Sequence, residues 1–214
     1  IKGWEYKGFL FFRWFKVSYI EGNICDSEYL LEESYIDKFL DKAVIISNED
    51  NIDFTKSYVF MANHVSAMDA VFIWADIYSL GIMAKEELFK FKPLGNIFKA
   101  AGVFPIARGK KDFGHVFHAV NVVNKEKKNL LIFPEGTRKA RLKNLKAKNG
   151  AVYIAATAGV QVIPVHITED FKVFGKVKVT YMEPVTLNIT KENIKDKELM
   201  TAETQRIMDI IYGR

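Results

Sequence analysis

The stretch YVFMANHVSAMD, which runs from Tyr58 to Asp69, joins a short apolar run to the start of a helix. Its first five residues are apolar and mostly bulky, a composition that favours a strand. Ser66 can cap a helix, and apolar residues at helical spacing follow Asp69 as far as about Ser79. A strand, a polar turn and a helix are therefore predicted here, an order that is typical of α/β proteins.

The same alternation of patterns continues from about residue 43 to the end of the chain. Short β-rich runs lie at 43–47, 58–62, 81–84, 103–106, 129–133, 160–167 and 176–182. Helical patterns mark 89–101, 112–123, 149–158 and 196–212. This order predicts an α/β fold with a central, mostly parallel sheet flanked by helices. Pro164 would suit an edge strand or a bulge better than the sheet centre, because proline lacks a backbone N–H.

The N-terminal part of the chain differs in composition from the rest. We expect a helical, aromatic-rich segment at 1–42 and the main domain at 43–214. Gly8 to Ile20 (GFLFFRWFKVSYI) crowds aromatic side chains around Arg13 and Lys16, a mixture typical of the water–lipid boundary. The alternative is a helix that packs on the core of the domain. The charges interrupt the apolar run, so a helix that spans a membrane is not expected.

Charge and cysteine content narrow the function classes. The chain has 214 residues, a formal charge of +5 and a pI of about 9.1, so anionic partners are expected. Charge alone leaves acidic lipid, a phosphate-bearing substrate, an acidic carrier protein and nucleic acid open. The aromatic-basic signature of an RNA-recognition motif is absent, so we expect no nucleic acid partner. Cys25 is the single cysteine, which excludes an intramolecular disulfide and favours a reducing compartment.

His64 and Asp69 lie five residues apart across the predicted strand-to-helix turn. A neutral imidazole can take a proton from a hydroxyl group, and a carboxylate on its other nitrogen fixes the tautomer and stabilises the cation. Free backbone N–H groups at the helix start could also stabilise an oxyanion. The alternative is a turn histidine beside an acid that favours the helix dipole. Ser66 is a rival nucleophile, but it lacks the GxSxG turn of such serines.

A second motif, FPEGTR at Phe133 to Arg138, also follows a predicted strand, where α/β folds usually place ligand sites. Gly136 lets the backbone approach a ligand closely, and Arg138 presents a planar fork that matches phosphate oxygens. Thr137 adds a hydroxyl group, and Glu135 could accept a hydrogen bond from a glycerol hydroxyl. The alternative is a Pro-Glu-Gly turn with a solvated arginine.

Other basic residues and histidines are weaker candidates. Lys85 follows a predicted strand and could bind phosphate, and six cations without an acid occur from Arg138 to Lys148. That stretch could bind a phosphate, coenzyme A, an acidic acyl carrier protein or anionic lipid, and a solvated loop is the alternative. His115 and His118 lie three residues apart on a predicted helix, but no further ligand completes a set, so no metal is expected.

The HxxxxD pattern of His64 and Asp69, followed by FPEGTR, resembles the glycerolipid acyltransferase family. Two further stretches match that family. Gly102 to Arg108 (GVFPIAR) has the glycine, hydrophobic residue and arginine of a second substrate-binding box, and Val162 to Val165 (VIPV) matches an apolar box with a proline. Ala67-Met68 departs from the aromatic residue or leucine that many relatives carry before the aspartate, which leaves the acceptor subclass open.

The resemblance implies an acyltransferase that is membrane-associated, on the cytoplasmic face, and needs no cofactor. It would move a fatty acyl group from acyl-CoA or acyl carrier protein to lysophosphatidic acid (1-acyl-glycerol 3-phosphate), giving phosphatidic acid for phospholipid biosynthesis. Glycerol 3-phosphate and other lysophospholipids are alternative acceptors. A non-catalytic basic module that binds membrane or nucleic acid is the alternative from another class.

The same resemblance implies a role for each residue of the motifs. His64 would remove the hydroxyl proton, and Asp69 would orient His64. The residues implied to hold the phosphate side of the acceptor are Arg108, Glu135, Gly136, Thr137 and Arg138, with Lys85 as a further candidate.

Overall fold

The computed structural model describes residues 44–48, 50, 52–66, 68–77, 79–90, 102–106, 114–138, 146–168, 177–190 and 192–214. Three predictions therefore lie outside the described residues: the aromatic segment at 8–20, most of the helix at 89–101, and Arg108. The division of the chain between residues 42 and 43 stays a prediction for the same reason.

The described strands form one seven-stranded sheet. They are β1 (Val44–Ser47), β2 (Val59–Ala62), β3 (Leu80–Lys85), β4 (Val103–Ile106), β5 (Asn129–Ile132), β6 (Val162–Ile167) and β7 (Val177–Tyr181). Their order across the sheet is β1-β7-β6-β2-β5-β3-β4. All neighbours pair in parallel except β6 and β7, which are antiparallel. The predicted central, mostly parallel sheet is confirmed.

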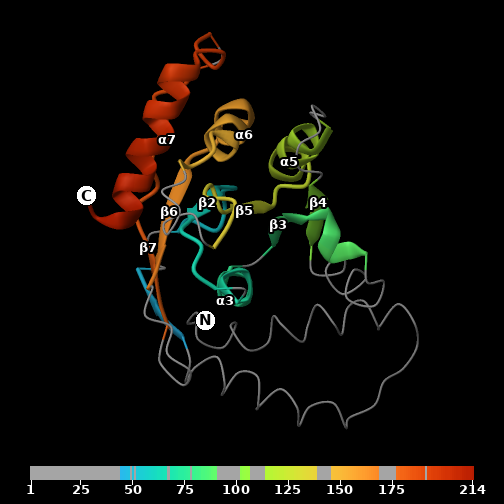
Figure 1. Cartoon of the computed structure of the whole chain (residues 1–214), viewed down its shortest axis with the longest axis vertical. Coiled ribbons are helices and arrows are strands. Elements are labelled where there is room, and N and C mark those ends of the chain that lie inside the picture. The colour runs from blue at the N-terminus through green and yellow to red at the C-terminus, as the bar shows by residue number, and fades with distance from the viewer. Residues whose placement is uncertain are drawn as a thin grey trace, which may run out of the picture.

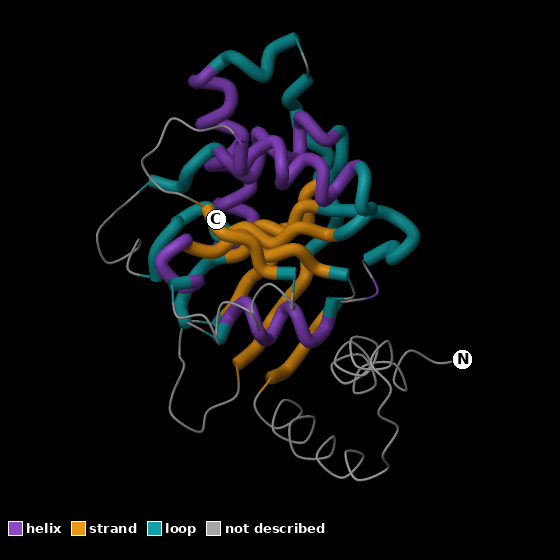
Figure 2. Tube along the Cα trace, turned by 90° about the vertical axis from the view of Figure 1, so that its right-hand side faces the viewer, coloured by secondary structure: helices purple, strands orange, loops and turns teal. Residues whose placement is uncertain are grey.

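Helices cover both faces of this sheet (Figures 1 and 2). On one face lie α5 (Gly114–Asn124), α6 (Gly150–Ala158) and α7 (Lys197–Tyr212), and on the other lies α3 (Asp69–Asp76). A short 3-10 helix, η3 (Glu86–Phe89), follows β3. The predicted flanking helices are confirmed for the described residues. No helix in this part of the chain combines the length and apolar character that crossing a bilayer requires.

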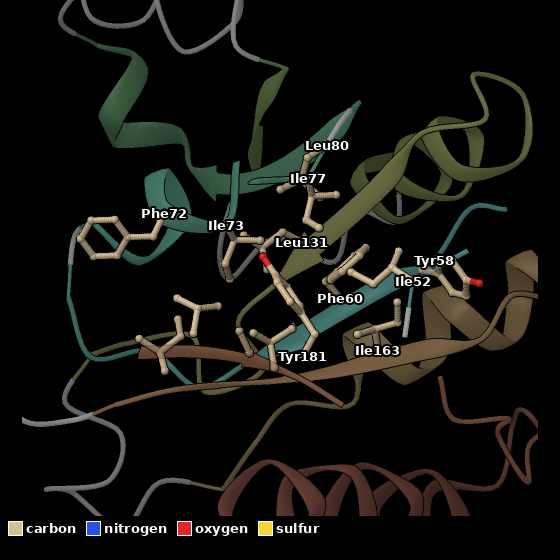
Figure 3. Close-up of a cluster of buried hydrophobic side chains, with 14 of the residues drawn as sticks. Ile52, Tyr58, Phe60, Phe72, Ile73, Ile77, Leu80, Leu131, Ile163 and Tyr181 are labelled. Atoms are coloured by element: carbon tan, nitrogen blue, oxygen red, sulfur yellow. The ribbon is translucent and has the colours of Figure 1, made fainter. Parts of the chain in front are cut away.

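Strand β2 contributes to two cores, one on each face of the sheet. Phe60 packs on the side of α3 with Ile73, and its ring meets that of Tyr181 edge-on at 6.0 Å between centroids (Figure 3). Val59 and Met61 pack on the other side, against α5, α6 and α7. All four β2 residues are fully buried, as expected for a parallel strand that is covered on both faces. This packing fixes the point at which the chain leaves the sheet toward His64.

The limits of α3 differ from the prediction. Ser66 does not cap this helix, because the N-cap residue is Met68, whose side chain makes no capping hydrogen bond. The Ser66 hydroxyl instead accepts the Met68 N–H at 3.2 Å and closes a short turn ahead of the helix. The helix ends at Asp76 rather than near Ser79, because the backbone becomes extended at Ile77.

Pro164 lies in an interior strand, so its placement at a sheet edge is wrong. Strand β6 has β2 on one side and β7 on the other. Pairing with β7 is in register over 165–167, but the next bridge, Val162 to Val185, is displaced by one residue. That extra residue lies on the segment opposite the proline, and Pro164 itself stays in register with Met61 of β2. The proline carbonyl still accepts a backbone hydrogen bond there, at 3.0 Å.

The topology brings the predicted site elements to one edge of the sheet. Strands β6, β2, β5, β3 and β4 are parallel neighbours, so their carboxyl ends share an edge. His64 follows β2, the FPEGTR motif follows β5, and Lys85 ends β3. Strand β4 leads toward Arg108 in the sequence. A ligand that lies along this edge would therefore pass all four elements.

Candidate active site

The side chains of His64 and Asp69 meet, as their spacing predicts. Asp69 Oδ2 lies 2.9 Å from His64 Nδ1, and the aspartate is fully buried at the start of α3. The histidine side chain is 21% exposed, and its Nε2 makes no hydrogen bond within the described part of the chain. A carboxylate at Nδ1 favours the tautomer with the proton on Nδ1 and a free lone pair on Nε2. That tautomer is the one that a general base requires.

Asn63 anchors the turn that carries the histidine. Its side-chain amide donates to the Ile167 carbonyl at 2.8 Å and accepts the Ile167 N–H at 2.7 Å. Asn63 is fully buried, and Ile167 is the last residue of β6. The pair of bonds ties the ends of two neighbouring strands together, so the backbone at His64 begins from a fixed point.

Asp69 also organises the backbone of the turn. Its Oδ2 accepts the N–H groups of Val65 at 2.7 Å and Ser66 at 2.8 Å, besides the His64 ring. The Met68 N–H is bonded to Ser66 Oγ. These three backbone donors, which precede α3, are used within the turn. The stabilisation of an oxyanion by the first N–H groups of the helix itself stays a prediction. The Ser66 hydroxyl accepts the Met68 N–H and makes no hydrogen bond to His64 among the described contacts. The structure therefore does not support Ser66 as a nucleophile.

Phe133 packs flat against the imidazole ring of His64. The two ring centroids are 4.3 Å apart and the planes differ by 25°. Phe133 directly follows β5, the parallel neighbour of β2, and this adjacency explains the contact between the two motifs. Stacking restrains the imidazole, and an aromatic face also attracts a cation, which a protonated histidine would be.

The FPEGTR motif forms a tight turn at the edge of the sheet. The Gly136 N–H donates to the Phe133 carbonyl at 3.0 Å, with Pro134 at the first central position of this β-turn. Gly136 has a φ of 66°, in the left-handed region where a Cβ is strained. The turn itself therefore requires the glycine, in addition to any ligand contact. Thr137 is half-buried and Arg138 is exposed beyond the turn, which leaves the guanidinium available to an anion.

Glu135 points into the protein and is only 7% exposed. Its Oε2 accepts the backbone N–H of His64 at 3.3 Å, and its Oε1 accepts a hydrogen bond from the Tyr212 hydroxyl. His166 meets the Tyr212 ring edge-on, with 6.4 Å between centroids. Sequence reasoning missed Tyr212 and gave His166 no role. No local signal could have paired Tyr212 with Glu135, because the packing of α7 on β6 brings them together.

The other residues that the sequence predicts to bind phosphate have side chains that the structure does not describe. Lys85 is the last residue of β3, which lies two strands from β2 in the sheet, about 10 Å away by ordinary strand spacing. The side chain of Lys85 lies outside the described residues, and so do Arg108 and most of the basic stretch after Arg138. Their roles therefore stay predictions.

Within the described ranges no three potential metal ligands cluster. The ring of His118 meets the ring of Phe104 edge-on.

Comparison with known proteins assigns the chain to a family. A family model described as Acyltransferase matches residues 43–168, more than half of the chain. The chain therefore belongs to the acyltransferase family. The match includes the His64–Asp69 pair and the FPEGTR motif, whereas Tyr212 lies outside it.

Individual relatives are more specific in name. The 1-acyl-sn-glycerol-3-phosphate acyltransferase of Streptococcus pneumoniae is 27% identical over 154 residues, which cover 69% of this chain and 55% of that protein. The protein of the same name from Saccharomyces cerevisiae is 30% identical over 168 residues, covering 71% of this chain and 54% of the relative. The chain thus spans about half the length of these relatives.

A solved structure has the same fold. The crystal structure of the 1-acyl-sn-glycerophosphate (LPA) acyltransferase PlsC from Thermotoga maritima matches with a TM-score of 0.60 and 23% identity. The match covers 97% of this chain and 87% of that one. At this identity the likeness shows a common fold.

Proposed function

We propose that this chain is a lysophosphatidic acid acyltransferase. It moves a fatty acyl group from a thioester, acyl-CoA or acyl carrier protein, to the free hydroxyl of 1-acyl-glycerol 3-phosphate and produces phosphatidic acid. The observation that carries the proposal is the 2.9 Å contact between His64 Nδ1 and buried Asp69, with Nε2 unengaged beside the FPEGTR turn. The names of the pneumococcal and yeast relatives support this choice of acceptor.

The chemistry begins with an alcohol, which is a weak nucleophile at neutral pH. His64 Nε2 takes the hydroxyl proton while the oxygen attacks the carbonyl carbon of the thioester. The tetrahedral intermediate then expels the thiolate, which takes the proton from the imidazolium as the C–S bond breaks. Asp69 stabilises the transient imidazolium at Nδ1, and the ring of Phe133 stabilises it from one face. No covalent acyl-enzyme and no metal enter this sequence.

The acceptor phosphate would lie along the edge of the sheet, away from His64. Arg138 is exposed just beyond the turn after β5, the strand next to β2. Lys85 ends β3, and Arg108 comes after β4 in the sequence; β3 and β4 are the next two strands beyond β5, each about 4.8 Å further along by ordinary strand spacing. Cations on one side of the base would orient the acceptor, with its hydroxyl at His64 and its phosphate toward β3 and β4.

We also propose that the enzyme works at the cytoplasmic face of a membrane, because its acceptor carries a fatty acyl chain. The segment Gly8 to Ile20 would lie in the interface, with its aromatic rings at the level of the headgroups. Changing Phe11, Phe12 and Trp14 to serine should weaken sedimentation with anionic vesicles, and added salt should weaken it further. Unchanged vesicle binding by this triple variant would contradict the role of the segment.

The test of the reaction is a matrix of donors and acceptors. Thiol release from a long-chain acyl-CoA or acyl carrier protein is followed with lysophosphatidic acid, glycerol 3-phosphate or another lysophospholipid, and products are identified by mass. We expect thiol release that depends on lysophosphatidic acid and gives phosphatidic acid. Turnover with glycerol 3-phosphate alone would reassign the acceptor. A folded protein that binds vesicles but turns over no pair would be the non-catalytic binding module.

A further inference from the structure

The end of α7 is joined to the histidine by a chain of hydrogen bonds. Tyr212, the last residue of α7, donates from its hydroxyl to Glu135 Oε1. Glu135 Oε2 in turn accepts the backbone N–H of His64 at 3.3 Å. The three residues are far apart in the sequence, since Glu135 comes 71 positions after His64 and Tyr212 comes 77 positions after Glu135. The link therefore depends on tertiary packing.

The ring of Tyr212 is held by neighbours from two directions. His166 on β6 lies edge-on to it, at 75° between the planes. The Arg214 guanidinium lies over the ring, with its central carbon 5.2 Å from the centroid. Gly213, with a φ of 65°, lets the backbone fold back just beyond the helix and brings the arginine there. These contacts do not involve the hydroxyl, so they should orient the ring with or without it.

Glu135 has an internal use for both of its oxygens. A buried carboxylate must be hydrogen-bonded, and here its donors are a phenol and a backbone amide. The bond to the His64 N–H, at 3.3 Å, is longer than the usual N–H···O distance, so the Tyr212 hydroxyl is needed to keep the carboxylate within reach of that amide. A carboxylate is also a poor neighbour for the phosphate of an acceptor, since the two charges have the same sign. The internal hydrogen bonds of Glu135 and its negative charge both favour a role within the protein over contact with the acceptor phosphate.

We infer that Tyr212 is a positioning residue for His64 and acts through Glu135. Asp69 fixes the imidazole from the Nδ1 side, while Tyr212 and Glu135 fix the backbone from which that imidazole projects. The inference rests on the proposed function, because it takes His64 to be the base. A small shift of the base relative to the acceptor hydroxyl slows proton transfer without changing how tightly either substrate binds.

The first test compares Tyr212→Phe with Tyr153→Phe, a matched loss of one hydroxyl at an exposed position on α6. In Tyr212→Phe we expect kcat to fall about tenfold, the effect of one charge-assisted hydrogen bond, with both KM values nearly unchanged. The control should keep its full kcat. A raised acceptor KM at constant kcat would instead place Tyr212 and Glu135 in acceptor binding and overturn the inference, as would an unchanged kcat.

A second measurement needs no substrate. The amide proton of His64, which is bonded to a carboxylate, should move upfield in the NMR spectrum of Tyr212→Phe and stay in place in Tyr153→Phe. An unmoved resonance would overturn the inference whatever reaction the enzyme performs. If the resonance moves but lysophosphatidic acid is not acylated, the proposed function fails and the structural link stands.

Variants of Glu135 keep the inference testable if Tyr212→Phe folds poorly. Glu135→Gln should retain most of kcat. The amide oxygen of the glutamine can accept the His64 N–H, and its NH2 group can donate to the Tyr212 hydroxyl, because a phenol oxygen is also an acceptor. Glu135→Leu should lose activity, and Tyr212→Phe added to it should cost nothing more, since the link is already broken. Additive losses, or a Gln variant as inactive as the Leu variant, would contradict the inference.

Discussion

Asp69→Asn tests the site most sharply, because the change keeps the shape of the side chain. The three donors that converge on Oδ2, from His64, Val65 and Ser66, can still bond to an amide oxygen at that position. The amide nitrogen must then occupy the place of Oδ1, which is buried and has no partner among the described residues. An unsatisfied buried donor costs about 1–3 kcal/mol, so we expect the free energy of unfolding to fall by that amount.

The effect on catalysis should be larger than the effect on stability. An amide oxygen carries no net charge, so the imidazolium that forms in the reaction loses the stabilisation that a carboxylate gives it. We expect kcat for thiol release to fall on the order of 10²–10⁴, with the fold intact by circular dichroism. Urea denaturation measures the stability, and release of thiol from acyl-CoA measures the rate.

The matched control is Asp196→Asn. Asp196 is the N-cap of α7 and accepts the N–H groups of Glu198 and Leu199 at 2.9 and 3.1 Å. Asparagine caps helices about as well as aspartate, and the position is exposed, so neither stability nor rate should change measurably. A folded Asp69→Asn variant with a near-normal rate would refute the role of the carboxylate in catalysis.

Three further changes test other parts of the site and fold. Arg138→Ala should raise the acceptor KM by roughly 10- to 100-fold and leave the donor KM nearly constant, because a charge-assisted contact to phosphate is lost. Gly136→Ala should lower the free energy of unfolding by about 1–2 kcal/mol, since φ is 66°, whereas Gly150→Ala should be tolerated because space for a methyl group exists there. Burial raises the pKa of the Glu203 carboxyl. Hydrogen bonds from the Arg206 side chain and the Asn188 backbone N–H, together with the charge of Arg206, outweigh burial and hold this pKa below its usual 4.5. The resulting stabilisation is present above pH 4.5 and is lost as the pH falls through the lowered pKa, so the stability difference between wild type and Glu203→Gln should shrink in acid.

Each of these has a contrary outcome. An equal rise in the donor KM would assign Arg138 to coenzyme A or carrier protein. Equal losses of stability at Gly136 and Gly150 would show that backbone conformation is not the cause. If the stability difference between wild type and Glu203→Gln stays constant between pH 7 and about 3, the Glu203 carboxylate does not contribute to the pH dependence of stability.

Local spacing predicted the pair at the centre of the site. His64 and Asp69 are separated by a strand-to-helix turn, and such a turn leaves few ways to place two side chains. The FPEGTR motif was placed after a strand by the same kind of pattern, but its contact with His64 was not predicted. That contact follows from the parallel pairing of β2 and β5, since neighbouring carboxyl ends share an edge.

The errors have physical causes of a different kind. Ser66 was expected to cap the helix, but its hydroxyl accepts the Met68 N–H ahead of the helix, and the carboxylate of Asp69 bonds to the N–H groups of Val65 and Ser66. The Asp69 carboxylate therefore takes up the backbone donors of the turn. Tyr212 could not be found from sequence, because its partner Glu135 is reached only through the packing of α7 on the sheet.

The central claim is that His64 is the base that activates the acceptor hydroxyl. The most direct test is His64→Ala, with the rate of thiol release measured at saturating acyl-CoA and lysophosphatidic acid. The account predicts a fall in kcat of at least about 10²-fold, with the circular dichroism spectrum and vesicle binding unchanged. A folded His64→Ala variant that makes phosphatidic acid at close to the wild-type rate would contradict the account.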